Sequence, residues 1–189
     1  MLRSSVVLLL AFTLLLGGAY PAAVTLAAHL LFPREAAGSV LRDARGEIVG
    51  SALVGQPFAD PGFFWGRPSA TAPVPYEGRA SGGSNQGPSS PALAGAVRAR
   101  VAALRASDPG NVAPVPVDLA TASGSGLDPH VSPAAALWQV PRVARARGLP
   151  DGPVRALVEA HVEQPFLGLF GAPRVNVLAL NVALDALAR

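Results

Sequence analysis

The chain contains neither cysteine nor lysine among its 189 residues. The absence of cysteine excludes disulfides, thiolate chemistry and cysteine-ligated zinc, but it does not identify the compartment. The absence of lysine excludes a Walker-type phosphate loop, which needs that side chain. It also raises the isoelectric point, because all fifteen basic side chains are arginines, whose pKa is higher than that of lysine. The excess over the twelve acids is only three charges. The basic balance therefore does not indicate a basic, nucleic-acid-binding surface.

Charged residues are few in general, at 14% of the chain. The densest arginine group is Arg142, Arg145 and Arg147, whose spacing suits one side of a helix. We expect these three side chains to form a solvated face, and we predict no nucleic-acid partner.

The N-terminal region lacks formal charge over 29 residues, from position 4 to position 32. As a helix, this run would reach about 43 Å, more than the roughly 30 Å of a bilayer core. The alternative is a signal peptide cleaved after the small residues 17–19. Because the apolar character resumes at Ala22, we expect an uncleaved anchor in which Tyr20 and Pro21 form a kink.

Residues 1–33 are thus predicted to be an N-terminal transmembrane anchor, with the span at about residues 6–30. Residues 34–189 are predicted to be one small soluble α+β domain. The side of the membrane is open from charge alone. Arg3 lies before the span and Arg34, Arg42 and Arg45 follow it, which would leave the domain in the cytoplasm.

The soluble part alternates apolar segments with turn residues, which indicates mixed helix and strand. We expect a β-hairpin at 39–43 and 47–54, and an edge strand at 115–119. We expect helices at 91–107, at 133–147 with a bend at Pro141, from 153 to Gln164, and at 177–187 capped by Asn176. Three adjacent aromatics, Phe63 to Trp65, are expected to pin an irregular segment to the core.

Two stretches rich in glycine and serine precede helices that begin with Ser-Pro. The first, Ser81, Gly82, Gly83, Ser84 and Asn85, could cradle a phosphate with backbone N–H groups, but we favour a tight turn at a subunit interface. The second, followed by an Asp-Pro-His corner, supplies candidate partner contacts at Ser123, Gly124, Ser125, Gly126, Asp128 and His130. Both loops are expected to be adaptable in the middle, and a large side chain at Gly83 or Gly124 is expected to hold a partner away.

Some of the same residues could instead form a hydrolase triad or a metal site, but the sequence argues against both. Ser123, Ser125, Asp128, His130 and His161 could form a hydrolase triad, but the Gly-x-Ser-x-Gly pattern is absent. Asp128, His130, His161 and Glu163 could bind a metal. If 161–163 were helical, however, two of those side chains would point about 200° apart. We predict no catalytic residue and no metal site.

Several motifs together resemble one family, the C subunit of the Kdp potassium-transporting ATPase. The motifs follow in order at residues 66–69, 81–85, 116–119, 121–136, 139–143, 175–177, 180–181 and 184–185. The resemblance implies a non-catalytic subunit of a bacterial potassium-import complex, which assembles or stabilises the complex. It also implies a catalytic chaperone that raises the ATP affinity of a P-type ATPase subunit.

The same resemblance implies two protein partners, the P-type ATPase subunit and a channel-like potassium-binding subunit, besides membrane lipid. No cofactor is expected to bind this chain firmly, since ATP and potassium belong to the whole complex. The implied location is the bacterial inner membrane, with one span and the soluble domain on the outer side. The alternatives left open are an anchored or secreted serine hydrolase-like domain and a generic membrane-anchored binding module.

Overall fold

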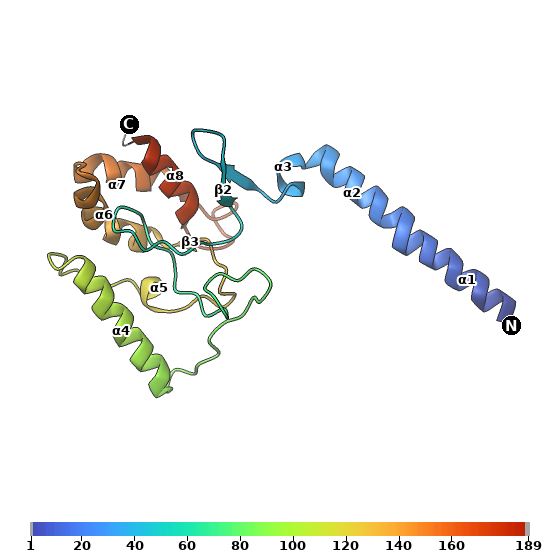
Figure 1. Ribbon diagram of the computed structural model, residues 1–189, viewed down its shortest axis with the longest axis horizontal. Coiled ribbons are helices and arrows are strands. Elements are labelled where there is room, and N and C mark those ends of the chain that lie inside the picture. Colours follow the sequence, from blue (N-terminus) through green and yellow to red (C-terminus); the bar gives the residue numbers. More distant parts are fainter. Residues whose placement is uncertain (1, 188–189) are drawn as a thin grey trace. The chain divides into compact units, whose positions relative to one another are not determined.

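The structure is a computed structural model that describes residues 2–187 (Figure 1). Contacts within the chain divide it into two compact units, one that ends at Val40 and one that begins at Leu41. The first unit is helical and the second combines helices with two small sheets. The fold class is therefore α+β, as predicted.

The first unit is a long apolar helix built from α1 (Leu2–Leu14), the π-helical turn η1 (Leu15–Ala19) and α2 (Tyr20–Leu31). The helical stretch of 30 residues has a mean hydropathy of 2.0, and among residues 2–187 no other helix is long and apolar enough to cross a membrane. A single helical turn, α3 (Pro33–Ala36), follows it.

The expected kink at Tyr20 and Pro21 does not occur, because the helix runs on through this point (Figure 1). Proline cannot donate a backbone hydrogen bond. The turn before Pro21 is the wider π-helical turn η1, in which the Tyr20 N–H donates to the Leu15 carbonyl five residues back. This wider turn accommodates the proline.

The second unit begins with the predicted hairpin, formed by β1 (Val40–Arg42) and β2 (Ile48–Ser51). Asp43 closes its turn, since Oδ1 accepts from the backbone N–H groups of Arg45 at 2.8 Å and Glu47 at 3.0 Å. Gly46 takes a φ of 83°, which favours glycine.

The remaining elements follow a long irregular stretch. They are α4 (Pro91–Ser107), α5 (Val117–Ala120), β3 (His130–Val131), α6 (Pro133–Arg147), α7 (Asp151–Ala160), β4 (Val162–Glu163), β5 (Arg174–Asn176) and α8 (Val177–Leu187). The strands β3, β5 and β4 form an antiparallel sheet in that order. His130 pairs with Asn176, and Val162 with Val175.

Both Ser-Pro pairs begin helices as predicted, but the Ser90 side chain makes no capping hydrogen bond, whereas the caps at Ser132 and Asn176 form. The Ser132 hydroxyl accepts from the Ala135 N–H at 3.1 Å, and Asn176 Oδ1 accepts from the Ala179 N–H at 3.0 Å. Gly148 ends α6 with a φ of 65°. Pro141 lies inside α6 without ending it.

Two predicted elements are wrong. The expected edge strand at 115–119 is the one-turn helix α5, whose Leu119 and Ala120 are buried while Val117 is exposed. The expected helix to Gln164 ends at Ala160, and the chain enters β4 instead. In both places the alternation of a few apolar residues could not decide between strand and helix, and tertiary packing did.

The hydrophobic core lies mainly between α6, α7 and α8. Val140 and Val143 of α6, Val154 and Val158 of α7, and Leu180 of α8 are all fully buried. The apolar residues recur every three to four positions on each helix, so each helix turns one face inward.

The aromatic segment crosses this core without regular secondary structure, and buried polar side chains satisfy its backbone. Asn181 accepts from the Phe64 N–H at 2.8 Å and donates to the Phe64 carbonyl at 3.0 Å. Gln139 makes the equivalent pair of bonds with Trp65, at 2.8 and 3.1 Å. Phe64 is fully buried, so these amides replace the partner strand that the segment lacks.

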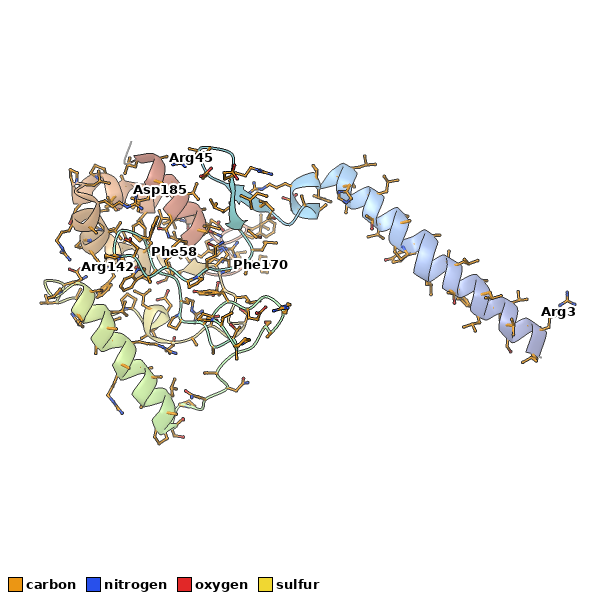
Figure 2. All side chains as sticks on the ribbon, viewed as in Figure 1. Arg3, Arg45, Phe58, Arg142, Phe170 and Asp185 are labelled. Carbon is orange, nitrogen blue, oxygen red and sulfur yellow. The ribbon has the colours of Figure 1, made fainter. Side chains whose placement is uncertain are left out.

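Arg142 completes this network and corrects the expectation of a solvated arginine face (Figure 2). It is only 1% exposed, donates to the Phe63 carbonyl at 3.1 Å and to Gln139 Oε1 at 2.6 Å, and stacks over the Trp65 ring. Burial lowers the pKa of Arg142 to about 10, which still leaves it charged at neutral pH.

The neighbouring arginines differ from Arg142. Arg147 lies over the Phe63 ring and pairs with Asp185 at 2.7 Å, while Arg145 is exposed and pairs with the buried Asp108 at 2.8 Å. Helical spacing predicted that the three arginines share one side of the helix. It could not show that the aromatic segment covers part of that side.

We expect Asn181→Leu to destabilise the chain strongly, because leucine has a similar size but leaves both polar groups of Phe64 buried and unpaired. The cost is about 2 to 5 kcal/mol, or a melting temperature about 5 to 15 °C lower. Thermal unfolding of the full chain in detergent measures it. Ala186→Leu, on the exposed side of the same helix, is the control and should melt like the parent. Equal melting of both variants would contradict the role given to Asn181.

Candidate functional site

The two glycine- and serine-rich loops, residues 81–85 and 123–126, lie against each other. The Gly82 N–H donates to the Ser125 carbonyl at 2.8 Å, and the Ser81 hydroxyl reaches the same oxygen at 3.1 Å. A Cβ on Gly83 would stand 2.9 Å from the Gly124 carbonyl oxygen. Loops that are about forty residues apart in the sequence therefore form one surface, which we call the paired loops.

The segment that follows the three aromatic residues, at Pro68 and Ser69, holds the second of the paired loops through hydrogen bonds. The Ser123 N–H donates to the Pro68 carbonyl at 3.1 Å, and the Ser69 hydroxyl donates to the Gly126 carbonyl at 2.7 Å. Ser69 Oγ also accepts from the Tyr76 N–H at 2.9 Å. The motif at residues 66–69 is thus a bracket that holds the second loop.

Asp128 lies beside the paired loops and contacts two basic side chains, Arg67 and His130. Its carboxylate contacts Arg67 Nη1 at 3.2 Å, accepts from the His130 N–H at 3.0 Å and lies 3.5 Å from His130 Nδ1. The hydrogen bond with the His130 side chain, together with the Arg67 charge, holds the pKa of Asp128 below its ordinary value. Burial, with the Asp128 charge nearby, raises the pKa of Tyr76 to about 12.

A shallow cleft of about 500 Å³ opens next to Asp128. Charged side chains of both signs line it, along with the exposed Val117 and the end of the β4–β5 connection at Ala172 and Pro173. Asp118 is already engaged, since its Oδ2 accepts from the Ser132 N–H at 2.7 Å. The cleft therefore offers a mixed, half-neutralised surface rather than a site for one strongly charged ligand.

The structure separates the candidate residues into supporting and exposed positions. Ser123 and Gly126 are buried, and Gly82 and Gly83 are half-buried between the loops. Ser84, Asn85, Gly124 and Ser125 are exposed. A side chain at Gly83 would first meet the second loop of this chain, while its predicted contact with a partner stays a prediction. Gly124 has nothing within 4 Å of an added Cβ.

The serines of the second loop serve as local hydrogen-bond acceptors. Ser123 Oγ accepts from the Gly126 N–H at 2.8 Å, and Ser125 Oγ accepts from the Leu127 N–H at 3.1 Å. These are serine turns, which shape the backbone of the loop. The hydrolase alternative gains no geometric support here.

The proposed metal ligands are committed to other groups. His161 Nδ1 contacts the Leu157 carbonyl at 2.8 Å, and Glu163 pairs with Arg174 at 2.9 Å. Over residues 2–187, no three side chains among His, Asp and Glu come close enough to hold an ion.

Sequence reasoning missed Arg67, Ser69 and Tyr76 as parts of this site. Two of them belong to the Gly-Arg-Pro-Ser motif, which was noticed as a family feature but given no role. Tyr76 had no signal, because only the folded chain brings its hydroxyl to the Arg67 carbonyl and its ring to Gly55.

We expect Asp128→Asn to lower the free energy of unfolding by about 1 to 3 kcal/mol at neutral pH, since charged hydrogen bonds are lost. Because the folded state holds the pKa of Asp128 low, this stabilisation is lost as pH falls through the folded-state pKa. The difference between the two proteins should therefore shrink below about pH 4. Thermal melts at neutral and acid pH measure it.

Glu163→Gln is the control for that experiment, because it removes an ion pair whose side chains are both about half exposed. It should cost about 0.5 kcal/mol or less at any pH. A pH-independent loss in Asp128→Asn would show that shape rather than charge matters at this position.

Comparison with known proteins covers almost the whole chain. The family model described as "K+-transporting ATPase, c chain" matches residues 2–186. A potassium-transporting ATPase KdpC subunit of Polaromonas naphthalenivorans is 65% identical over 98% of this chain and 94% of its own length. The subunit of the same name from Sorangium cellulosum is 63% identical over 97% and 96% of the two lengths.

A more distant relative, the KdpC subunit of Geobacter sulfurreducens, is 53% identical over 98% of this chain and 97% of its own length. The matches span the apolar helix, the aromatic segment and the paired loops alike. The chain belongs to the KdpC family, the C subunits of potassium-transporting ATPases.

Proposed function

We propose that this chain is a non-catalytic, single-pass subunit of a bacterial potassium-import ATPase, and that it assembles the complex and raises the ATP affinity of the P-type ATPase subunit. Near full-length similarity to KdpC subunits carries the proposal. The partners it implies are the ATPase subunit and a channel-like potassium-binding subunit.

The chemistry of the chain supports a non-catalytic role. A P-type pump is phosphorylated within an Asp-Lys-Thr-Gly motif, and this sequence has no lysine. The candidate serines accept backbone hydrogen bonds, and Asp128 is held by Arg67 and His130. Among the described residues, neither serine hydroxyl has a hydrogen bond to a histidine or a carboxylate that could serve as its base.

The geometry of the first loop favours an indirect effect on ATP. A phosphate cradle needs several free backbone N–H groups that point at one anion. The Gly82 N–H is already bonded to Ser125, and Gly83 packs on Gly124. We therefore propose that ATP affinity changes by coupling through the partner subunits, which fits a soluble domain on the outer side of the inner membrane.

The exposed middle of the paired loops is our candidate for the partner contact. Ser84, Asn85, Gly124 and Ser125 project from a base that hydrogen bonds make rigid. A rigid base with small exposed residues lets a partner backbone approach closely at little entropic cost.

We expect Gly124→Val to fold normally but to lose its partners, because a Cβ there meets no atom of this chain. Affinity purification in mild detergent from potassium-starved cells should recover about tenfold less ATPase subunit than with the parent chain. Gly152→Val, at another open glycine on α7, is the matched control and should recover the parent amount. Full recovery with Gly124→Val would remove the paired loops from the interface.

We expect a cysteine at position 84, introduced as Ser84→Cys, to react with a membrane-impermeant maleimide in intact spheroplasts. The chain has no other thiol and Ser84 is exposed, so the signal is specific. Leu2 lies at the N-terminal end of the apolar helix, which would be on the opposite side of the membrane. Leu2→Cys should therefore react only after lysis. The reverse pattern would place the domain in the cytoplasm and reopen direct contact with ATP.

A further inference from the structure

The connection between β4 and β5 exposes four large apolar side chains at one turn. Phe166, Leu167, Leu169 and Phe170 are 66 to 81% exposed, although they are consecutive apart from Gly168. We call residues 166–170 the apolar tip. Scattered surface leucines are ordinary, but a contiguous group of this kind marks a contact surface.

Most backbone N–H groups of the apolar tip are hydrogen-bonded within the turn. Phe166 and Phe170 form a bridge, with the Phe166 N–H 3.1 Å from the Phe170 carbonyl and the Phe170 N–H 3.0 Å from the Phe166 carbonyl. The Gly168 and Leu169 N–H groups bond within the same turn, at 2.9 and 3.1 Å. Pairing these N–H groups within the turn lowers the free-energy cost of moving the turn out of water.

Charge is absent from the tip and present at its base. Residues 164–173 carry no charged side chain, and Gln164 is the only polar one. The ion pair between Arg174 and Glu163, at 2.9 Å, stands where the tip joins the sheet. This order, apolar at the end and charged behind, matches the gradient from acyl chains to headgroups.

The tether to the apolar helix keeps the domain close to lipid. Only the residues between Leu31 and Val40 separate that helix from β1, and they span at most about 30 Å even when extended. The strand that follows the tip, β5, lies beside the end of the β1–β2 hairpin, because Asn176 Nδ2 donates to the Ala52 carbonyl just after β2, at 2.8 Å.

We propose that the apolar tip inserts into the lipid surface of the membrane that holds the anchor, as a second attachment of the soluble domain. The inference rests on the proposed anchor but not on potassium transport. Lipid is favoured over a protein pocket because the tip offers no side-chain hydrogen bond beyond Gln164, whereas protein interfaces ordinarily combine an apolar centre with a polar rim. Attachment at two points fixes the orientation of the domain.

The test places an environment-sensitive fluorophore at Leu169→Cys in the otherwise thiol-free full chain, reconstituted into phosphatidylethanolamine and phosphatidylglycerol vesicles. Val112→Cys is the matched control, since Val112 is an equally exposed apolar residue on the connection after α4. Nitroxide lipids labelled about 5 to 10 Å below the headgroups should quench position 169 several-fold more than position 112. Iodide in the water should quench in the opposite order.

A second variant separates insertion from local folding. Leu167 has a φ of 54°, which asparagine adopts readily, so Leu167→Asn keeps the turn while removing one apolar side chain. It should reduce lipid quenching at position 169 several-fold. Flotation with the vesicles reports the anchor separately, so a failed anchor is distinguishable from a failed tip.

Equal lipid quenching at positions 169 and 112 in floating vesicles would overturn the proposal. Protection of position 169 from both quenchers would also overturn it, and would assign the tip to a protein partner or to a second copy of the chain.

Discussion

Three buried side chains, Gln139, Arg142 and Asn181, supply hydrogen-bond partners to a segment that has no neighbouring strand. Phe64 lies fully inside the core, where an unpaired backbone group costs about 1 to 3 kcal/mol. The amides of Gln139 and Asn181 match the N–H and C=O groups of Trp65 and Phe64 in pairs. Burial of Phe64 in the core therefore depends on these side chains, which we call the polar clamp.

The clamp also determines where the candidate site lies. Trp65 is followed directly by the motif that carries Arg67 and Ser69, so fixing the aromatic segment fixes these two side chains. Arg67 then meets Asp128, and Ser69 holds Gly126. Helices α6 and α8 thus fix the position of the paired loops through the aromatic segment, although neither helix contributes a residue to the loop surface.

The surfaces left exposed differ in kind, which suits a subunit with several contacts. The paired loops present small residues on a hydrogen-bonded base, a form that suits close approach of a folded partner. The apolar tip presents leucine and phenylalanine without polar atoms, a form that suits lipid. The apolar helix Leu2–Leu31 is exposed along its length and has the composition of a membrane span.

The sequence by itself determined the features that depend on neighbours along the chain. The apolar run predicted the long helix, and the Ser-Pro pairs and Asn176 predicted helix starts, because capping and hydropathy act over a few residues. The ordered motifs identified the family. Local pattern failed where short segments were ambiguous, as at residues 115–119 and at His161.

Only the tertiary structure decided which residues meet across the chain. The contact of Gly83 with Gly124, the bracket from Ser69 and the burial of Arg142 join segments tens of residues apart. Arginine spacing on one helix gives the direction of a side chain but not what covers it. The aromatic segment covers Arg142 because its buried backbone needs a donor there, and that need arises only when the chain is folded.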